Sequence, residues 1–258
     1  MKNTALITGA SAGIGRELAR IHAQKGGDLI LVARRRDALD TLAAELKAAH
    51  GTQSLVIAAD LSQETAPQMI YDQLRAADVT VDILINNAGF GGRGTFHERA
   101  WADDRSMIQV NIVALSALTR LVLPNMVARN SGRILNVSST ASMMPGPLQA
   151  VYFASKAYVT FFSNALTEEL HDTNVTVTAL LPGATETEFA QVSGMDQTGL
   201  FNKTVSANSV AQDGYDAMMA GEMDRISGLQ PMQKIMFRVM KFLPKRIAIR
   251  EIRKMQDV

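Results

Sequence analysis

Three side chains near the middle of the chain have the types and the spacing of a proton-transfer site: Ser139, Tyr152 and Lys156. The tyrosine and the lysine are four residues apart, which on a helix places both on one face about a turn apart. An ammonium group beside a phenol favours the phenolate and lowers its pKa, so Tyr152 could act as a general acid or base. Ser139, at the end of an expected strand, could hydrogen-bond a substrate oxygen. The alternative is an ordinary Tyr–Lys pair on a helix surface.

Two further turns have residue types typical of a ligand site in an α/β protein. At residues 8–15 the order T-G-A-S-A-G-I-G follows an expected strand and opens an expected helix. Glycines in that position permit a tight turn and let a pyrophosphate approach the helix N-terminus. A tight turn without a ligand is the alternative. The second turn, at 86–89, also follows a strand and lies at the edge where open α/β sheets bind ligands.

The elements that must position these groups alternate regularly along the chain. Short runs of β-branched and aliphatic residues predict strands at 4–8, 28–33, 54–58, 82–86, 133–137, 174–181 and near Ile226. Longer runs predict helices at 13–26, 37–50, 62–77, 101–128, 150–171 and 210–220. Strands that are apolar on both faces and separated by helices predict a parallel sheet covered on both sides. The expected fold is α/β: a single domain over 1–258 with a doubly wound, Rossmann-type sheet in three α/β/α layers.

Composition excludes several classes of protein. Of the 258 residues, 47% are hydrophobic and 20% charged, as in a soluble globular protein rather than a disordered or collagen-like chain. The absence of cysteine excludes disulfides and thiolate chemistry, and the four histidines have no metal-ligand spacing, so no metal is expected. A net charge of +1 gives no bulk attraction to nucleic acid. No segment has the pattern of a targeting or membrane-spanning element, which makes the cytoplasm the expected location.

Two segments fall outside the regular alternation. Residues 183–208 form a long stretch with several Gly, Ser and Thr, which predicts a substrate lid. Residues 232–258 form two expected helical stretches broken at Pro244, with eight Lys and Arg against two Asp and Glu. We expect these basic amphipathic helices to pack on the domain or on a second subunit, with their charges solvated. The alternatives are peripheral contact with an anionic membrane surface or binding of an acidic substrate carrier.

Taken together and in order, these motifs resemble those of the short-chain dehydrogenases/reductases. The resemblance covers 4–187 and rests on T-G-x-x-x-G-I-G, N-N-A-G, the serine ahead of Y-x-A-S-K, and the Pro–Gly pair at 182–183. It implies that Tyr152 is the general acid/base, that Ser139 orients the carbonyl, and that Lys156 lowers the tyrosine pKa and holds the nicotinamide ribose. Asn111 matches the family asparagine that supports a water relay to the lysine. A helix kink or a buried polar contact is the alternative for Asn111.

The same resemblance implies a nicotinamide cofactor. Its expected contacts are Gly9, Ser11, Gly13, Ile14, Gly15, Arg34, Asp60, Leu61, Asn87, Ala88, Gly89, Tyr152, Lys156, Pro182, Gly183 and Thr187. The strand at 28–33 ends without the carboxylate that an NAD site needs for the ribose 2′-hydroxyl. Arg34 follows at once, which favours a 2′-phosphate and hence NADP(H). Asp60 resembles the family residue that contacts the adenine amino group, and Thr187 the one that contacts the nicotinamide carboxamide. A basic helix start with solvated arginines is the alternative.

These expectations define a function: NADP(H)-dependent hydride transfer between the nicotinamide and a carbonyl or secondary alcohol, with Tyr152 moving the proton. Several apolar side chains expected around the pocket favour a hydrophobic small-molecule substrate: Phe90, Met143, Met144, Leu148, Phe189 and Met195. The family resemblance implies a homo-oligomer, either a dimer or a tetramer. The alternative function is a non-catalytic nucleotide-binding sensor or scaffold that retains the fold. Loss of Tyr152 or Lys156 would favour it, and both are present.

Overall fold

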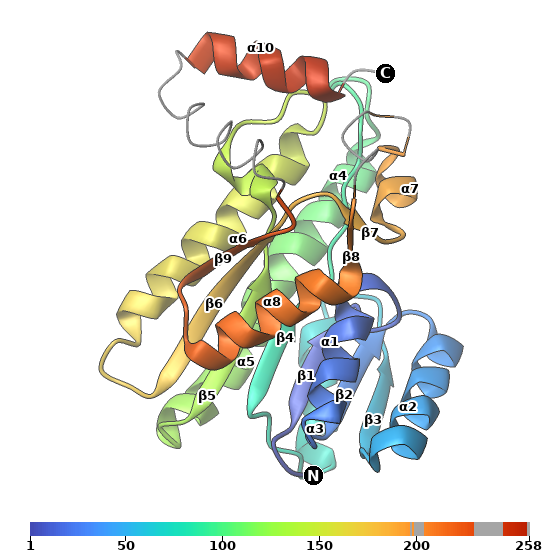
Figure 1. Cartoon of the computed structure of the whole chain (residues 1–258), viewed down its shortest axis with the longest axis vertical. Helices are drawn as coiled ribbons and strands as arrows, with labels where there is room; N and C mark the ends of the chain where they lie inside the picture. The colour runs from blue at the N-terminus through green and yellow to red at the C-terminus, as the bar shows by residue number, and fades with distance from the viewer. Residues whose placement is uncertain (197, 199–203, 230–244, 257–258) are drawn as a thin grey trace.

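The computed structural model describes residues 1–196, 198, 204–229 and 245–256. Its centre is a sheet of seven parallel strands in the order β3-β2-β1-β4-β5-β6-β9 (Figure 1). The strands are β1 (Ala5–Thr8), β2 (Leu29–Ala33), β3 (Ser54–Ala58), β4 (Ile83–Asn86), β5 (Gly132–Val137), β6 (Val175–Pro182) and β9 (Asp224–Ser227). This parallel, doubly wound order confirms the fold class expected from the sequence.

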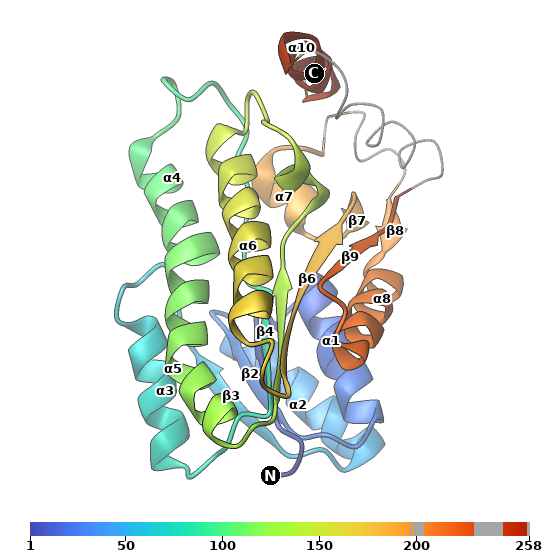
Figure 2. The ribbon, with the colours of Figure 1, turned by 90° about the vertical axis from the view of Figure 1, so that its left-hand side faces the viewer.

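Helices cover both faces of the sheet (Figure 2). On one face lie α1 (Gly13–Gln24), α2 (Arg36–His50) and α8 (Ala207–Ala220). On the other lie α3 (Ala66–Ala76), α5 (Leu115–Ala128) and α6 (Ala150–Glu169). Successive strand residues point to opposite faces, so Ile7 packs with the first helix layer and Leu6 with the second, and both are fully buried. That arrangement explains why the strands are apolar on both faces.

Two helices begin three or four residues away from the expected position, each for a local reason. The helix expected at 62–77 begins at Ala66, with Pro67 in its first turn, where the missing backbone N–H costs no hydrogen bond. The helix expected at 210–220 begins earlier, at Ala207. There the Ser206 side chain accepts a hydrogen bond from the Ser209 backbone N–H and caps the first turn.

The helix expected at 101–128 is one continuous run that is not α-helical throughout. It consists of α4 (Trp101–Ile108), a π-helical stretch η1 (Gln109–Ala114) and α5. Such stretches occur often at functional sites, and this one carries the buried Asn111. Among the described residues this run alone has the length and apolar composition to cross a membrane. In the structure it packs on the sheet through Leu118 and Val122.

The order in which strands are added to the sheet reverses at β1. β2 and β3 lie on one side of β1, and β4 and the later strands of the sheet lie on the other. Ligands of such sheets bind at the carboxyl ends of the strands beside this point. Here Thr8 joins the two turns singled out in the sequence. Its Oγ1 accepts hydrogen bonds from the backbone N–H groups of Asn87 and Ala88, both at 3.0 Å. The Asn87 side-chain amide donates in return to the Thr8 carbonyl at 2.9 Å.

Short elements surround the carboxyl ends of the strands. β7 (Thr185–Glu186) pairs with β8 (Val205–Ser206), and α7 (Phe189–Ser193) lies between them in the chain, all within the expected lid. α10 (Lys245–Gln256) lies across the top of the molecule at the same end (Figures 1 and 2). It falls in the second of the two expected C-terminal stretches. The first, before Pro244, lies outside the described residues.

Candidate active site

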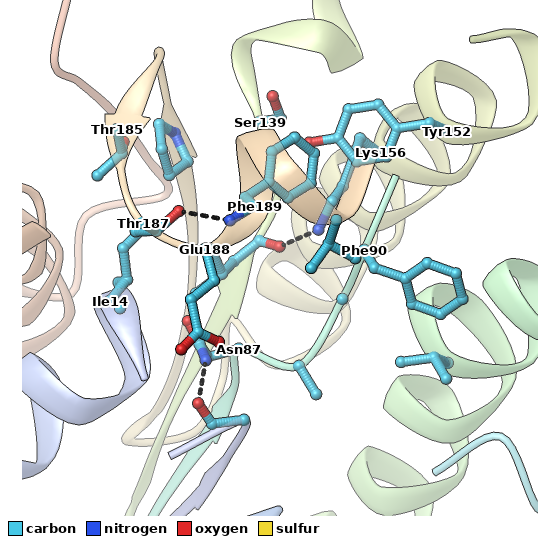
Figure 3. Close-up of a pocket in the computed structure, with 18 of the residues that line it drawn as sticks. Ile14, Asn87, Phe90, Ser139, Tyr152, Lys156, Thr185, Thr187, Glu188 and Phe189 are labelled. Atoms are coloured by element: carbon cyan, nitrogen blue, oxygen red, sulfur yellow. Dashed lines mark hydrogen bonds between the residues drawn. The ribbon is translucent and has the colours of Figure 1, made fainter. Parts of the chain in front are cut away.

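A cavity of about 760 Å³ lies at the carboxyl ends of the strands. One end, which we call the glycine-turn end, is lined by Gly9, by residues 11–14 and by the residues that follow β2, β3 and β4. The other, the helical end, is lined by side chains of η1, α6, α7 and α10. Figure 3 shows Ser139, Tyr152 and Lys156 grouped together, with Ile14 and Thr187 toward the glycine turn. The volume is that of a cofactor or substrate pocket.

The expected catalytic residues converge from β5 and α6. Tyr152 and Lys156 lie one turn apart near the start of α6, and both are buried. Ser139 follows β5 and hydrogen-bonds the Tyr152 side chain, while its Oγ also accepts from the Ala141 backbone N–H at 3.1 Å. The Lys156 ammonium donates to the Val137 carbonyl at 2.8 Å. These contacts hold three polar side chains at one point of the cavity.

Ser138 and Ser139 bond to different neighbours. The Ser138 hydroxyl donates to the Lys156 carbonyl at 2.9 Å and lies 2.7 Å from the Thr160 hydroxyl, so it ties β5 to α6. Ser139 is the serine whose side chain meets Tyr152. The choice of Ser139 as the catalytic serine, which the offset from the tyrosine favours, stays a prediction.

The acidities of the tyrosine and the lysine are set by burial. Burial raises the pKa of Tyr152 to about 12, and the hydrogen bond with Ser139 opposes that shift. Burial also lowers the pKa of Lys156 to about 8. The expectation that Lys156 lowers the pKa of Tyr152 is not met in this structure. The ammonium lies 6.0 Å from the centre of the tyrosine ring and bonds to a carbonyl, so the cost of burying a phenolate dominates.

We expect the buried Lys156 to make stability depend on pH. Its pKa of about 8 in the folded chain lies below its ordinary value of 10.5, so folding disfavours the ammonium form. This destabilising contribution to the free energy of unfolding has its full size below pH 8 and decreases as the pH rises toward 10.5. Relative to Lys156→Met, the wild-type chain should therefore gain on the order of 3 kcal/mol of unfolding free energy across that interval.

Urea unfolding of both proteins at several pH values between neutral and 10.5 measures this difference. Lys47→Met, which replaces an exposed lysine on α2, is the control and should run parallel to the wild type. A stability difference between wild type and Lys156→Met that does not change with pH would contradict the prediction.

Asn111 lies next to the cavity wall rather than in it. Its amide nitrogen donates to the Phe90 carbonyl and to the Ser155 hydroxyl, both at 3.0 Å, and its oxygen accepts from the Phe90 backbone N–H. A Cβ at Gly89 would lie 3.1 Å from the Asn111 oxygen and 3.2 Å from the Lys156 ammonium. Asn111 therefore fixes the turn after β4 against α6. The water relay to Lys156 stays a prediction.

Nearly all of the expected cofactor contacts line the cavity. These are Gly9, Ser11, Gly13, Ile14, Arg34, Asp60, Leu61, Asn87, Ala88, Gly89, Tyr152, Lys156, Pro182, Gly183 and Thr187. Gly15 is the exception, because it faces into the turn. A Cβ there would fall 2.3 Å from the Asn87 amide nitrogen and 2.5 Å from the Gly9 carbonyl. A glycine is required at position 15 because a side chain would clash within the turn, and not because a ligand contacts it.

The glycine-turn end fits a dinucleotide. Gly13 has a φ of +53°, and a Cβ there would lie 2.9 Å from a Thr187 methyl carbon, so a larger residue would narrow the cleft. No side chain caps the N-terminus of α1. Its first N–H groups are therefore available to an anion such as a pyrophosphate.

Two arginines lie at this end, and one of them was not among the residues expected from the sequence. Arg34 lines the cavity and lowers the pKa of Asp60 slightly, although the backbone N–H of Ser62 is the main cause. Arg35 also lines the cavity and donates to the Ser11 hydroxyl at 3.2 Å and to both carboxylate oxygens of Glu188 at 3.0 Å. The run of three arginines was the available signal, but it does not say which side chains turn inward.

The helical end is mostly apolar. Its lining includes Phe90, Val110, Met144, Phe153, Phe189, Val192 and Ile252. Met143, Leu148 and Met195, also expected there, do not line the cavity. Ile252 and Gln256 of α10 were not expected, because nothing in a helical pattern shows which surface covers it. The Phe189 ring lies 5.3 Å from the Tyr152 ring, centre to centre, and both bound the same space.

Comparisons with known proteins agree with this geometry. Very-long-chain 3-oxoacyl-CoA reductase of Homo sapiens is 36% identical over 194 residues, covering 73% of this chain and 61% of that protein. NADP-dependent 3-hydroxy acid dehydrogenase of Shigella flexneri is 38% identical over 208 residues, covering 80% and 82%. A solved short-chain dehydrogenase from Sphingobium yanoikuyae in complex with NADPH has a TM-score of 0.82 and 31% identity, covering 93% of this chain and 96% of its own.

The chain spans 60–62% of the length of the first curated relatives that it matches. The sequence model of the family described as short chain dehydrogenase matches residues 3–198, which include both turns and Ser139, Tyr152 and Lys156. The chain belongs to the short-chain dehydrogenase family.

Proposed function

We propose that this chain is an NADP(H)-dependent oxidoreductase that interconverts a hydrophobic ketone or aldehyde and the corresponding alcohol. One observation carries the proposal: a single cavity holds Ser139, Tyr152 and Lys156 together with a turn suited to a pyrophosphate and two arginines. Relatives support the cofactor, because one is named NADP-dependent and another was solved with NADPH.

In this proposal the side chains of the protein move the proton. NADPH, when bound, supplies the hydride. In the direction of reduction the Tyr152 hydroxyl donates its proton to the carbonyl oxygen, and the Ser139 hydroxyl donates a hydrogen bond to the same oxygen. Burial keeps the pKa of Tyr152 far above neutral pH, so the phenol holds its proton there and is ready to act as the acid. Reduction is therefore the direction that the side chains favour at neutral pH.

The apolar helical end favours a hydrophobic substrate. The relatives named for 3-oxoacyl-CoA and 3-hydroxy acid chemistry make compounds with an oxygen at C3 the first to test. The experiment follows NADPH absorbance with 3-oxoacyl thioesters, hydrophobic ketones and aldehydes, using wild type and Tyr152→Phe in parallel. Turnover by the wild type that is lost in the variant supports the proposal. A protein that binds NADPH but reduces nothing on this panel would support the sensor or scaffold alternative.

Glu188→Gln should raise the affinity for NADP⁺ about threefold, with a smaller effect on NAD⁺. The Glu188 carboxylate occupies two N–H groups of Arg35 and offsets the positive charge that a 2′-phosphate would meet. Calorimetric titration with both coenzymes measures the two affinities. Glu186→Gln is the matched control, because that exposed carboxylate lies two residues away and does not line the cavity. Equal gains for both coenzymes would contradict the role given to Arg35.

We also propose that residues 183–208, of which 197 and 199–203 lie outside the described part of the chain, close over the substrate as a lid. Thr187, Glu188 and Phe189 line the cavity, so ligands at either end would contact this segment. Backbone amides at 184–196 should gain protection from hydrogen exchange when NADP⁺ and a substrate analogue are added together. Unchanged protection in that segment would argue against a lid.

We propose a homo-oligomer in the cytoplasm as the working form. Phe161 and Tyr158 of α6 are 71% and 40% exposed, which is unusual for large apolar side chains on a covering helix. A second subunit that packs on α6 would bury them. Light scattering should report a dimer or tetramer for the wild type and a smaller species for Phe161→Glu.

A further inference from the structure

α10 is held on the domain by one of its sides. Ile252 and Gln256 are buried, and Ile252 packs in the apolar cluster that includes Tyr152. The Gln149 side-chain amide donates to the Gln256 side-chain oxygen at 3.0 Å, and the Arg93 guanidinium donates to the Gln256 carbonyl at 2.8 Å. These contacts fix the last turns of α10 over the helical end of the cavity, and they determine which side of the helix faces outward.

The side of α10 that faces away from the domain is basic. Residues 245–256 contain five Lys and Arg against one acidic residue, whereas the whole chain is nearly neutral, at +1. The acidic residue, Glu251, already forms an ion pair with Lys254 at 2.7 Å. Four basic side chains are exposed at helical spacings that place them along one side: Arg246, Arg250, Arg253 and Lys254. This side therefore favours an anionic partner.

Two large aromatic side chains are exposed at the same end of the molecule. The loop between β4 and α4 reaches the top of the molecule beside α10 (Figure 2), and its Arg93 contacts the end of that helix. Phe96 in this loop and Trp101 at the start of α4 are each 60% exposed. Ile247 adds an exposed aliphatic side chain on α10 itself. Apolar side chains that gather at one end of a molecule indicate an interaction surface.

An anionic phospholipid surface has the chemistry that fits both features. Basic side chains are attracted to the anionic lipids of the leaflet that faces the cytoplasm, and aromatic rings favour the boundary between headgroups and acyl chains. An acidic protein would pair with the arginines but would not by itself account for the exposed aromatic rings. Glu98 and Asp103 are exposed in the same segment as these rings, so we expect contact at the headgroups without deep insertion.

The cavity opens next to this loop. Val192 of α7 lines the cavity and is also exposed, so the cavity reaches the surface of the molecule there. α7 lies against the same loop, because a Cβ at Gly91 would fall 2.9 Å from the Phe189 ring. The opening is therefore close to the basic and aromatic side chains.

We propose that α10 and the loop at 91–101, which together we call the α10 face, bind peripherally to an anionic phospholipid surface. The basic side chains of α10 contact the headgroups, and Phe96 and Trp101 lie just below them. This orientation brings the opening at Val192 near the lipid. A hydrophobic carbonyl compound dissolved in the membrane would then enter the cavity from the bilayer, a consequence that rests on the proposed reductase function.

Sedimentation with two kinds of vesicle tests the proposal. One kind contains phosphatidylcholine alone, and the other also contains phosphatidylglycerol. The partition coefficient should be about tenfold or more higher for the anionic vesicles at low salt, and this difference should shrink with added salt because ions screen the attraction.

Trp101 provides a direct probe of the α10 face, because it is the single tryptophan of the chain. Its fluorescence emission should shift to shorter wavelength when anionic vesicles are added, since the indole ring then leaves water. Lipids with brominated acyl chains in those vesicles should quench it.

A pair of substitutions with a matched control locates the basic part of the face. Arg246→Gln with Arg250→Gln should lower the partition coefficient about tenfold or more, because each basic group near an anionic surface contributes about fivefold. Arg36→Gln with Lys47→Gln removes the same charge from exposed positions on α2 and should change the coefficient less than about twofold. Calorimetric binding of NADPH checks that each variant is folded.

A second pair tests the apolar part. Phe96→Ser should lower the partition coefficient several-fold, and salt should not change this loss, because it comes from apolar burial. Met219→Ser, at an exposed position near the end of α8, is the control and should bind as the wild type does.

The outcomes are distinct. Equal binding to both kinds of vesicle, a control pair that weakens binding as much as the α10 pair, or an unchanged Trp101 spectrum would overturn the proposal. Binding to polyglutamate or to duplex DNA without binding to vesicles would also overturn it, and would identify an acidic polymer as the partner. Tyr152→Phe should bind vesicles as the wild type does, so a failure of the reductase function would leave this result unchanged.

Discussion

Tyr152→Phe should lower kcat for carbonyl reduction by about a hundredfold or more, with NADPH binding retained. The substitution keeps the aromatic ring that packs against Phe153 and Phe189, and it removes only the hydroxyl that meets Ser139. The loss should therefore fall on proton transfer and leave the fold intact. Single-turnover absorbance of bound NADPH measures the chemical step directly.

The same helix offers a matched control for this variant. Tyr158 lies less than two turns farther along α6, where its hydroxyl pairs with Ser116 at 3.0 Å and its ring is partly exposed. Tyr158→Phe should keep nearly the full kcat. If Tyr152→Phe retained more than about a tenth of the wild-type kcat, Tyr152 would not be the general acid.

NADPH should be preferred over NADH by about tenfold or more in kcat/KM, because Arg34 and Arg35 line the glycine-turn end of the cavity and their guanidinium groups are suited to pair with a 2′-phosphate. Arg34→Asp should erode this preference by weakening NADPH and should affect NADH less. Arg35→Gln should act in the same direction, because Arg35 holds Ser11 at the mouth of the glycine turn.

Arg36→Gln is the control for both arginine variants. Arg36 points away to Asp40 within α2 at 3.4 Å and does not line the cavity, so its loss should leave the coenzyme preference unchanged. Equal kcat/KM for NADPH and NADH in the wild type would contradict the assignment of both arginines.

The fold, and the meeting of the candidate site residues in one cavity, could be predicted because they depend on short-range patterns. Leu6 and Ile7 are both apolar, which already indicates a strand covered on two faces, and a run of such strands with helices between them has few arrangements. The two turns and Ser139 each come directly after a strand. Because the carboxyl ends of parallel strands lie at one edge of the sheet, the topology brings these residues close together.

What the sequence did not show depends on contacts between distant segments. Arg35 turns into the cleft through Glu188, which is 153 residues away along the chain. Gln256 meets Gln149 across 107 residues, and the amphipathic pattern of α10 would be the same on a membrane, a second subunit or this cavity. The pKa of Tyr152 is raised and not lowered, because burial, which no spacing reveals, outweighs the hydrogen bond with Ser139.

The π-helical stretch between α4 and α5 makes the run from 101 to 128 sensitive to the deletion of a residue. Its wider turn shifts the phase of the two α-helical segments against each other, so that Asn111 faces Ser155 while Leu118 still faces the sheet. Removing one residue, even the exposed Val113, would restore ordinary α-helical turns while α4 and α5 kept their places on the sheet. The residues of η1 would turn to new directions, and Asn111 would lose its contact with Ser155. Substitutions at Val113 are therefore tolerable where a deletion is not.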